Sequence, residues 1–258
     1  MHKKHTFLLA FLFSLFLINP IVYASNSGSA KDSLIKMANK IASFKSFSVT
    51  LRMGYDVLQD NGEKIEFNEI RNFKIKRPSF ISVSATRSDG EQVGLLYNGE
   101  VMTQFNLNEK VYAQLEKKMD LDNFIYYAVS TLKIRVPLAR MLTSTFPSDL
   151  KRLCKEAYYV ERDVVVADVP TAHYAGRTED VDFQVWIADD NLPRRLIITY
   201  KKEEGQPQFW ADFKKWDINP RFSRDYFVFE PKKGMEKIPI LIPVKNEGKR
   251  MEEKDHVK

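Results

Sequence analysis

The chain has little of the side-chain chemistry on which most enzymes depend. Two of its four histidines lie within the first five residues, which leaves His173 and His256 for the rest of the 258-residue sequence. Zinc sites built from His and Cys, and nucleophilic triads that need a His base, therefore lack material. His173 stands between Ala172 and Tyr174 on an expected strand, where a locally satisfied imidazole is more typical than a general base. We expect no metal and no cofactor.

Cysteine is nearly absent. Cys154 is the only one, so an intramolecular disulfide is excluded. Two interpretations of this residue stay open: a small buried apolar side chain, or a thiol available for mixed disulfides.

Nucleotide and nucleophile motifs are also missing. Neither the Gly-x-Gly-x-x-Gly nor the Gly-x-Ser-x-Gly pattern occurs. Asp180 and Asp182 can share one strand face as a glycosidase pair would, but plain alternation produces the same spacing. Asp56, Asp60 and Glu63 match a calcium loop only loosely, and a hairpin turn explains them better. A hydrolase is therefore the weakest of the functional hypotheses, and the protein is expected not to be an enzyme.

Charge of one sign is not concentrated anywhere. The formal net charge is +6 from 40 Lys and Arg against 34 Asp and Glu, and no basic stripe with interleaved aromatic residues is seen. This dispersion argues against nucleic acid as a partner, while a mild attraction to anionic lipid headgroups stays open.

The first 24 residues have the pattern of a secretory signal peptide. A basic start at Lys3 and Lys4 precedes an apolar run over 7–18, and Pro20 breaks that run before Ala24. The alternative is an uncleaved anchor, but the run is shorter than the roughly 20 residues that a membrane span needs. We therefore expect cleavage after Ala24 and a location in the periplasm.

The remainder reads as one domain followed by a tail. Residues 245–258 are nearly all charged without an apolar pattern, which predicts disorder. No linker divides 25–244, so this segment is predicted to form a single β domain.

One long strand is the strongest signal that is present. Apolar residues alternate with mostly polar ones along it, at Phe47, Val49, Leu51, Met53, Tyr55 and Val57. A turn at Asn61-Gly62 leads into a second long strand over 64–76, which ends at Arg77-Pro78. A hairpin of this length with one apolar face needs a large apolar partner surface.

Further strand patterns recur between turns and predict an α+β fold. An amphipathic helix over 31–44 precedes the hairpin, and about eleven antiparallel strands are expected in all. Those after the hairpin cover 80–86, 92–97, 101–106, 110–115, 158–169, 171–177, 181–188, 194–203 and 208–218.

A helical insert interrupts the run of strands. Its apolar residues are spaced as on helices from Asp120 to Phe146, with a break near Val136-Pro137 and an expected stop at Pro147. It reads either as a lid or plug, or as an ordinary helix that closes one end of the sheet.

Several short motifs resemble those of the periplasmic lipoprotein carrier LolA, in the same order along about 31–240. They are Ile41-Ala42-Ser43-Phe44, Lys76-Arg77-Pro78-Ser79-Phe80, Asn98-Gly99-Glu100, Trp186-Ile187 before Leu192-Pro193, and Phe227-Val228-Phe229-Glu230-Pro231. Trp216-Asp217-Ile218-Asn219 with Phe222-Ser223 resembles more closely a family of uncharacterised predicted periplasmic proteins with the LolA-like fold.

The resemblance implies a half-open antiparallel β-barrel wrapped around a few short helices, with an apolar cavity for acyl chains. It also implies that Arg77 contacts a lid, and the fixed fork of guanidinium donors suits backbone carbonyls there. The candidate cavity residues are Phe47, Val49, Leu51, Met53, Tyr55, Phe73, Ile75, Leu95 and Tyr97. The same side chains could instead form a filled core.

Two functions follow as hypotheses. The first is a soluble periplasmic carrier for lipid or lipoprotein acyl chains, with a membrane protein as a further partner that donates or accepts cargo. The second is an envelope stress or assembly module that binds a protein.

Overall fold

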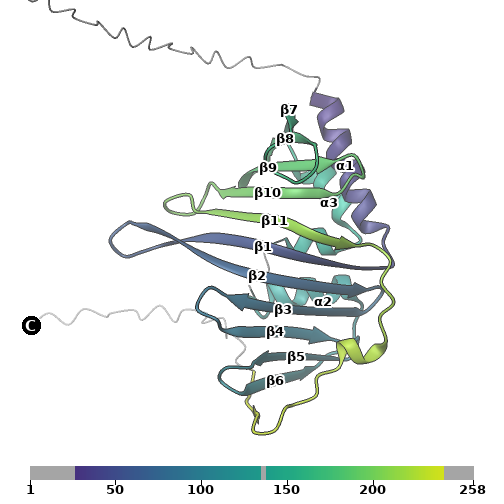
Figure 1. The fold of residues 1–258 in the computed structure, drawn as a ribbon, viewed down its shortest axis with the longest axis vertical. Coiled ribbons are helices and arrows are strands. Elements are labelled where there is room, and N and C mark those ends of the chain that lie inside the picture. Colours follow the sequence, from purple (N-terminus) through teal and green to yellow (C-terminus); the bar gives the residue numbers. More distant parts are fainter. Residues whose placement is uncertain (1–26, 135–137, 241–258) are drawn as a thin grey trace, which may run out of the picture.

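The computed structural model describes residues 27–134 and 138–240, and all of its strands belong to one sheet (Figure 1). The strand order is β12-β6-β5-β4-β3-β2-β1-β11-β10-β9-β8-β7, so two separate chain halves meet where β1 pairs with β11. The strands are β1 (Ser46–Leu58), β2 (Lys64–Lys76), β3 (Phe80–Arg87), β4 (Gln92–Tyr97), β5 (Val101–Asn106), β6 (Val111–Glu116), β7 (Glu156–Asp163), β8 (Thr171–Arg177), β9 (Val181–Ala188), β10 (Pro193–Tyr200), β11 (Gln208–Asp217) and β12 (Glu236–Lys237).

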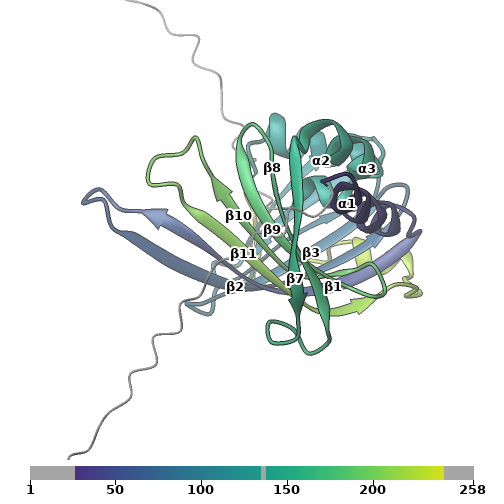
Figure 2. The same cartoon turned by 90° about the horizontal axis from the view of Figure 1, so that it is seen from above.

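The sheet curves, and the three α-helices gather on its concave side (Figure 2). The helices are α1 (Ser27–Ala42), α2 (Leu121–Ser130) and α3 (Phe146–Leu153), with short 3-10 helices η1 (Ala139–Leu142) and η2 (Arg224–Phe227). Asp120 caps α2, since its carboxylate accepts from the backbone N–H of Asn123 at 2.8 Å.

The core fills the space between the helices and the middle of the concave face. The apolar side chains of β1 at Phe47, Val49, Leu51 and Met53 are at most 4% exposed, as are Phe73 and Ile75 opposite them on β2. Leu34, Met37, Ala38 and Ile41 of α1 belong to the same cluster. The alternation along the sequence therefore marks the helix-covered face of the sheet.

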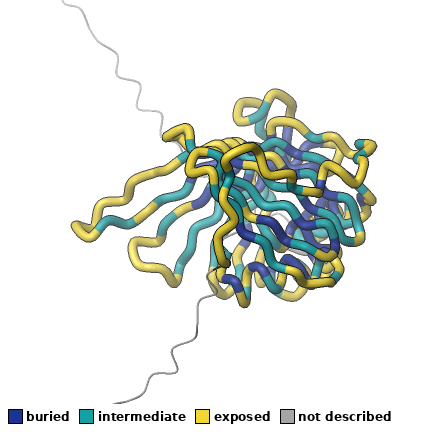
Figure 3. Tube along the Cα trace, turned by 90° about the horizontal axis from the view of Figure 1, so that it is seen from below, coloured by how far each residue is buried: buried dark blue, intermediate teal, exposed yellow. Residues whose placement is uncertain are grey.

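The far half of the β1–β2 hairpin extends beyond this core. Together with the β10–β11 hairpin it projects away from the body, and its surface is mostly exposed (Figures 2 and 3). Tyr55 stacks on Phe67 with ring centroids 6.2 Å apart, while Val57 and Ile65 near the tip are 38% and 44% exposed. The apolar face thus continues past the helices that cover it elsewhere.

A C-terminal strap crosses the opposite, convex face. Phe227 is buried there and lies 5.3 Å from Phe80 between ring centroids. Phe229 lies 5.1 Å from Phe105 and 5.2 Å from Tyr112, and the strap ends in β12, which pairs parallel to the edge strand β6. The motif at Phe227 therefore covers apolar residues outside the barrel and blunts one sheet edge.

The predicted fold class is confirmed. The observed sheet is open, with eleven antiparallel strands plus the two-residue β12. The expected segments 1–24 and 245–258, and the break at Val136-Pro137, lie outside the described residues. No helix of the described part of the chain is long and apolar enough to cross a membrane.

Several boundaries differ from the sequence predictions, and the structure gives the physical reason for two of them. Strand β7 ends at Asp163 rather than 169, because the Asp163 carboxylate bonds the N–H groups of Val165 and Val166 and turns the chain. Pro147 does not end a helix but lies in the first turn of α3, where its missing N–H costs nothing.

Truncation of the buried strand face should be costly. Leu51 is 1% exposed, so Leu51→Ala should lower the free energy of unfolding by about 2–5 kcal/mol through lost burial and a cavity. Val57→Ala, on the same face of the same strand but 38% exposed, should cost less than about 1 kcal/mol. Urea unfolding of both variants measures the difference, and equal losses would contradict the boundary placed between core and hairpin arm.

Candidate functional site

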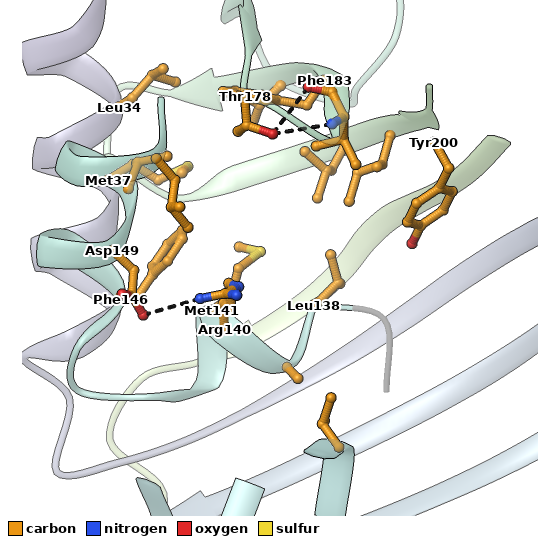
Figure 4. A pocket seen from close by; sticks show the side chains of 18 residues that line it. Leu34, Met37, Leu138, Arg140, Met141, Phe146, Asp149, Thr178, Phe183 and Tyr200 are labelled. Atoms are coloured by element: carbon orange, nitrogen blue, oxygen red, sulfur yellow. Dashed lines mark hydrogen bonds and ion pairs between the residues drawn. The ribbon is translucent and has the colours of Figure 1, made fainter. Parts of the chain in front are cut away.

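Two cavities flank the filled centre of the concave face. The first has a volume of about 340 Å³ and lies between the helices α1 and α3, the short helix η1, and strands β9 and β10 (Figure 4). Its wall is largely aliphatic and aromatic, and includes Leu34, Met37, Val129, Leu138, Met141, Phe146, Leu150, Leu153, Val181, Phe183, Val185, Leu196, Ile198 and Tyr200.

The polar groups in this first wall already have partners. Arg140 lies 3.6 Å from Asp149, measured from Nη1 to Oδ2, and Asp149 also accepts from Arg152 at 2.7 Å. The Thr178 hydroxyl accepts from the N–H groups of Asp180 and Val181 at 3.2 and 3.1 Å. The first cavity therefore offers a ligand mainly apolar surface without net charge.

The second cavity lies between strands β2–β5 and helix α2 and measures about 440 Å³. Its floor is apolar, formed by Ile81, Val83, Ala85, Val93, Leu95, Phe124, Ile125, Ala128, Leu132, Ile134 and Leu142. Three cations, Arg71, Arg87 and Lys133, line it as well, together with Gln104. The two cavities thus have similar sizes and different charge.

Arg77 ties together the elements that separate the cavities. Its Nη2 donates to the carbonyl oxygen of Leu142 at 2.9 Å, and its Nε donates to that of Phe44 at 3.2 Å. Nη1 lies 3.6 Å from Oδ1 of Asp122 on α2, and that carboxylate also accepts from the N–H of Ser144. Burial lowers the pKa of the Arg77 guanidinium, and Asp122 opposes this shift. One side chain therefore holds the end of β2 to η1, to α2 and to the end of α1.

The structure places the predicted cavity residues in different surroundings. Among the described residues, only Leu95 of the predicted set lines either cavity. Tyr55 is half-buried on the hairpin arm. Seven others are buried in the core: Phe47, Val49, Leu51, Met53, Phe73, Ile75 and Tyr97. Their role as ligand contacts, like the lid role of Arg77, stays a prediction.

Tyr97 is an example of a predicted cavity residue whose contacts are all used within the protein core. Its ring stacks on Phe124 of α2 with centroids 3.9 Å apart, and its hydroxyl donates to the carbonyl of Met119 at 2.8 Å. Burial raises the pKa of this phenol, with the bond to Met119 opposing the shift. Tyr97 anchors α2 and has no face left for the second cavity.

The cavity residues that the sequence prediction missed carried a usable signal. Val181, Phe183 and Val185 alternate along β9 in the same way as the apolar residues of β1. The alternation marks them as facing inward but does not say that the helices leave space above them.

Other reactive groups are used structurally. His173 is buried, stacks on Trp186 with centroids 4.0 Å apart, and has its pKa lowered by burial. Cys154 is also buried, burial raises the pKa of its thiol, and Sγ donates to the carbonyl of Glu156 at 3.2 Å. Within 27–134 and 138–240 no group of three or more His, Cys, Asp and Glu could hold a metal ion.

Removal of the Arg77 contacts should loosen η1 without unfolding the sheet. Arg77→Leu cannot donate to Leu142 and Phe44, so amide hydrogen exchange should accelerate at least about tenfold over residues 138–145. Lys118→Leu, a charge removal at a side chain that is 84% exposed, serves as the control and should leave this segment protected. Unchanged exchange over 138–145 in Arg77→Leu would show that the guanidinium is not the restraint.

Several solved structures resemble this one distantly. A Pseudomonas aeruginosa MucA/MucB complex shares 15% identity at a TM-score of 0.40, covering 78% of this chain and 61% of that chain. An uncharacterized conserved protein of Thermus thermophilus shares 7% identity at a TM-score of 0.45, and the match covers 82% of this chain and 99% of that chain. A LolA superfamily protein of Nitrosomonas europaea shares 12% identity at a TM-score of 0.37, and the match covers 78% of this chain and 97% of that chain. At such identities and TM-scores no role of those proteins transfers to this chain.

No curated protein sequence matches the chain. A family model described as "Predicted periplasmic protein (DUF2092)" matches residues 30–241. This match confirms both the expected likeness to a family of predicted periplasmic proteins and the expected periplasmic location. Because it spans most of the sequence, this chain belongs to the DUF2092 family of predicted periplasmic proteins.

Proposed function

We propose that this protein is a periplasmic carrier or binding protein for the acyl chains of lipids or lipoproteins. The observation that carries the proposal is the first cavity, which has about 340 Å³ of space and an apolar wall under the helices. That volume lies within the range of small-molecule binding pockets, roughly 300–1,000 Å³. The motif likeness to the LolA carrier supports the same class of cargo.

The chemistry of the wall fits hydrocarbon better than a polar metabolite. Each methylene transferred from water to such a wall contributes about 0.8 kcal/mol. A polar ligand would need unpaired donors or acceptors, whereas Arg140, Asp149 and Thr178 already bond to neighbouring groups. An acyl chain requires none of these partners.

Separate helical segments, α1, η1 and α3, roof the first cavity. The shortest of them is η1, which is held to the end of β2 through Arg77. A carrier must release its cargo to an acceptor, and a membrane protein is the proposed acceptor or donor. Movement of η1 is the proposed route.

Narrowing the first cavity should weaken acyl binding at that site. Val181→Phe adds a ring that excludes about three methylenes, so a fluorescent fatty acid should bind roughly 30-fold more weakly there, corresponding to ~2 kcal/mol. Probe titration and organic-solvent extraction of the purified protein measure binding and natural cargo. Val165→Phe, at a position 87% exposed, is the matched control and should bind as the native chain does. Absence of both extractable lipid and probe binding in the native protein would refute the carrier proposal.

A second candidate is a module that binds a protein partner, and one surface favours it. The loop after β7 holds four exposed valines, Val164, Val165, Val166 and Val169. Asp163 fixes the loop by accepting from two of its N–H groups and from Trp186 Nε1, and these backbone bonds lower the pKa of that carboxyl. A rigid apolar loop of this kind is typical of contact surfaces.

Polar replacement of this loop discriminates between the two candidates. If a protein partner binds at the loop, Val164→Ser with Val165→Ser should abolish a stoichiometric complex in envelope extracts and leave the acyl-probe affinity unchanged. A complex that survives these changes would place the contact elsewhere. A native chain that yields lipid and no stoichiometric protein would favour the carrier.

A further inference from the structure

The second cavity differs from the first in the charge of its lining. Among the described residues that line it, Arg71, Arg87 and Lys133 are cationic and none is an aspartate or glutamate. These cations come from three separate places in the chain: the middle of β2, the end of β3 and the segment after α2. Like charges that lie close together in one cavity repel each other, which is unfavourable unless anionic groups compensate them.

Two of the three cations have a carboxylate partner outside the cavity. Arg71 Nη2 bonds Glu69, which is buried and lies on the same strand two residues away. Arg87 Nη1 bonds Glu91, and Glu91 also accepts from Asn106 at 2.6 Å. Neither carboxylate lines the cavity, and each guanidinium keeps N–H groups beyond the one that bonds its anion.

Arg71 has a side-chain N–H donor that no described protein group accepts. Its side chain is only 16% exposed, and its Nε has no hydrogen-bond partner in the part of the chain that the structure describes. A buried donor without a partner is unfavourable, so Arg71 has hydrogen-bonding capacity that the described fold does not use. Lys133, which follows α2 and itself has a φ of 56°, adds an exposed ammonium.

The floor of the same cavity is hydrocarbon. Leu95, Phe124, Ile125 and Leu132 stand among its apolar walls, and the volume of about 440 Å³ exceeds that of the first cavity. A free inorganic anion would use the cations and leave this floor uncovered. A neutral acyl chain would use the floor and leave the cations unmatched.

We propose that the second cavity binds a single-chain anionic amphiphile, with its tail on the apolar floor and a carboxylate or phosphate head at Arg71, Arg87 and Lys133. The inference rests on the proposed function, since it takes the concave face to be a site for acyl chains. It goes beyond that function by assigning a second site and a charged class of ligand. The first cavity, where Arg140 is paired with Asp149, has no such selectivity.

The test compares a fluorescent polyene fatty acid with its methyl ester, which differ only in the charge of the head. In the Val181→Phe protein, whose first cavity is narrowed, the acid should bind about tenfold or more tightly than the ester at neutral pH. Arg87→Gln with Lys133→Gln should reduce this ratio to within about twofold, because the exposed cations are gone and the floor remains. The control pair Lys118→Gln with Arg152→Gln removes two cations that are 84% and 64% exposed elsewhere and should keep the ratio.

A second variant guards against misfolding of the first. Glu69→Gln with Arg71→Gln removes the buried pair together, so neither partner is left alone, and it should lower the preference for the acid, because one of the three cationic donors in the lining is lost. Inorganic phosphate alone should compete only weakly, since it lacks a tail. Competition at micromolar phosphate, or an unchanged acid-to-ester ratio in both double variants, would overturn the inference. Equal affinity of the Val181→Phe protein for acid and ester would overturn the inference and leave the carrier proposal standing, whereas binding of neither by the native protein would refute the carrier proposal.

Discussion

The rest of this structure follows from the need to cover one apolar sheet face with few helices. Twelve strands at about 4.8 Å spacing span roughly 50 Å, whereas a helix with its side chains is about 10 Å wide. Three short helices cannot cover such a width, even when the sheet curves towards them. The middle of the face, at β1 and β2, is filled by a buried cluster to which all three α-helices contribute. The uncovered remainder forms a cavity on each side of that centre and the exposed arm of the β1–β2 hairpin.

The chemistry of the two cavities reflects the strands that build them. On the β9–β10 side the inward positions are apolar throughout, and the polar residues on the helices opposite are paired with one another. On the β2–β5 side, inward positions include Arg71 and Gln104, so the sheet itself brings polar groups to the wall. An inward-facing Arg–Glu pair on a central strand costs desolvation, and hydrophobic residues of similar size often replace such pairs without loss of stability. Its presence at the wall of a cavity is better explained by binding than by stability.

The sequence predicted the sheet well because alternation and turn residues are local signals. The second strand of the hairpin, the Asn98-Gly99 turn and the strand over 181–188 are found where the pattern places them, and the strand predicted over 208–218 ends one residue earlier. The cavities could not be predicted in the same way. Phe47 and Phe183 both alternate inward, yet Phe47 is fully buried in the core and Phe183 lines an open space, and only the helix positions distinguish them. Those positions depend on contacts between segments more than 60 residues apart, such as Arg77 with Leu142.

That contact also defines how the two cavities can communicate. In η1, Met141 lines the first cavity and Leu142 lines the second. In α2, Val129 lines the first cavity and Ala128 lines the second, so η1 and α2 form the wall between the two cavities. Arg77 bonds to both parts of this wall, through the Leu142 carbonyl and through Asp122. A displacement of the wall that enlarges one cavity must alter the other, because the same backbone forms both sides. The filled centre at β1 and β2 is not part of this wall, so the wall can move while most of the buried apolar surface stays in place.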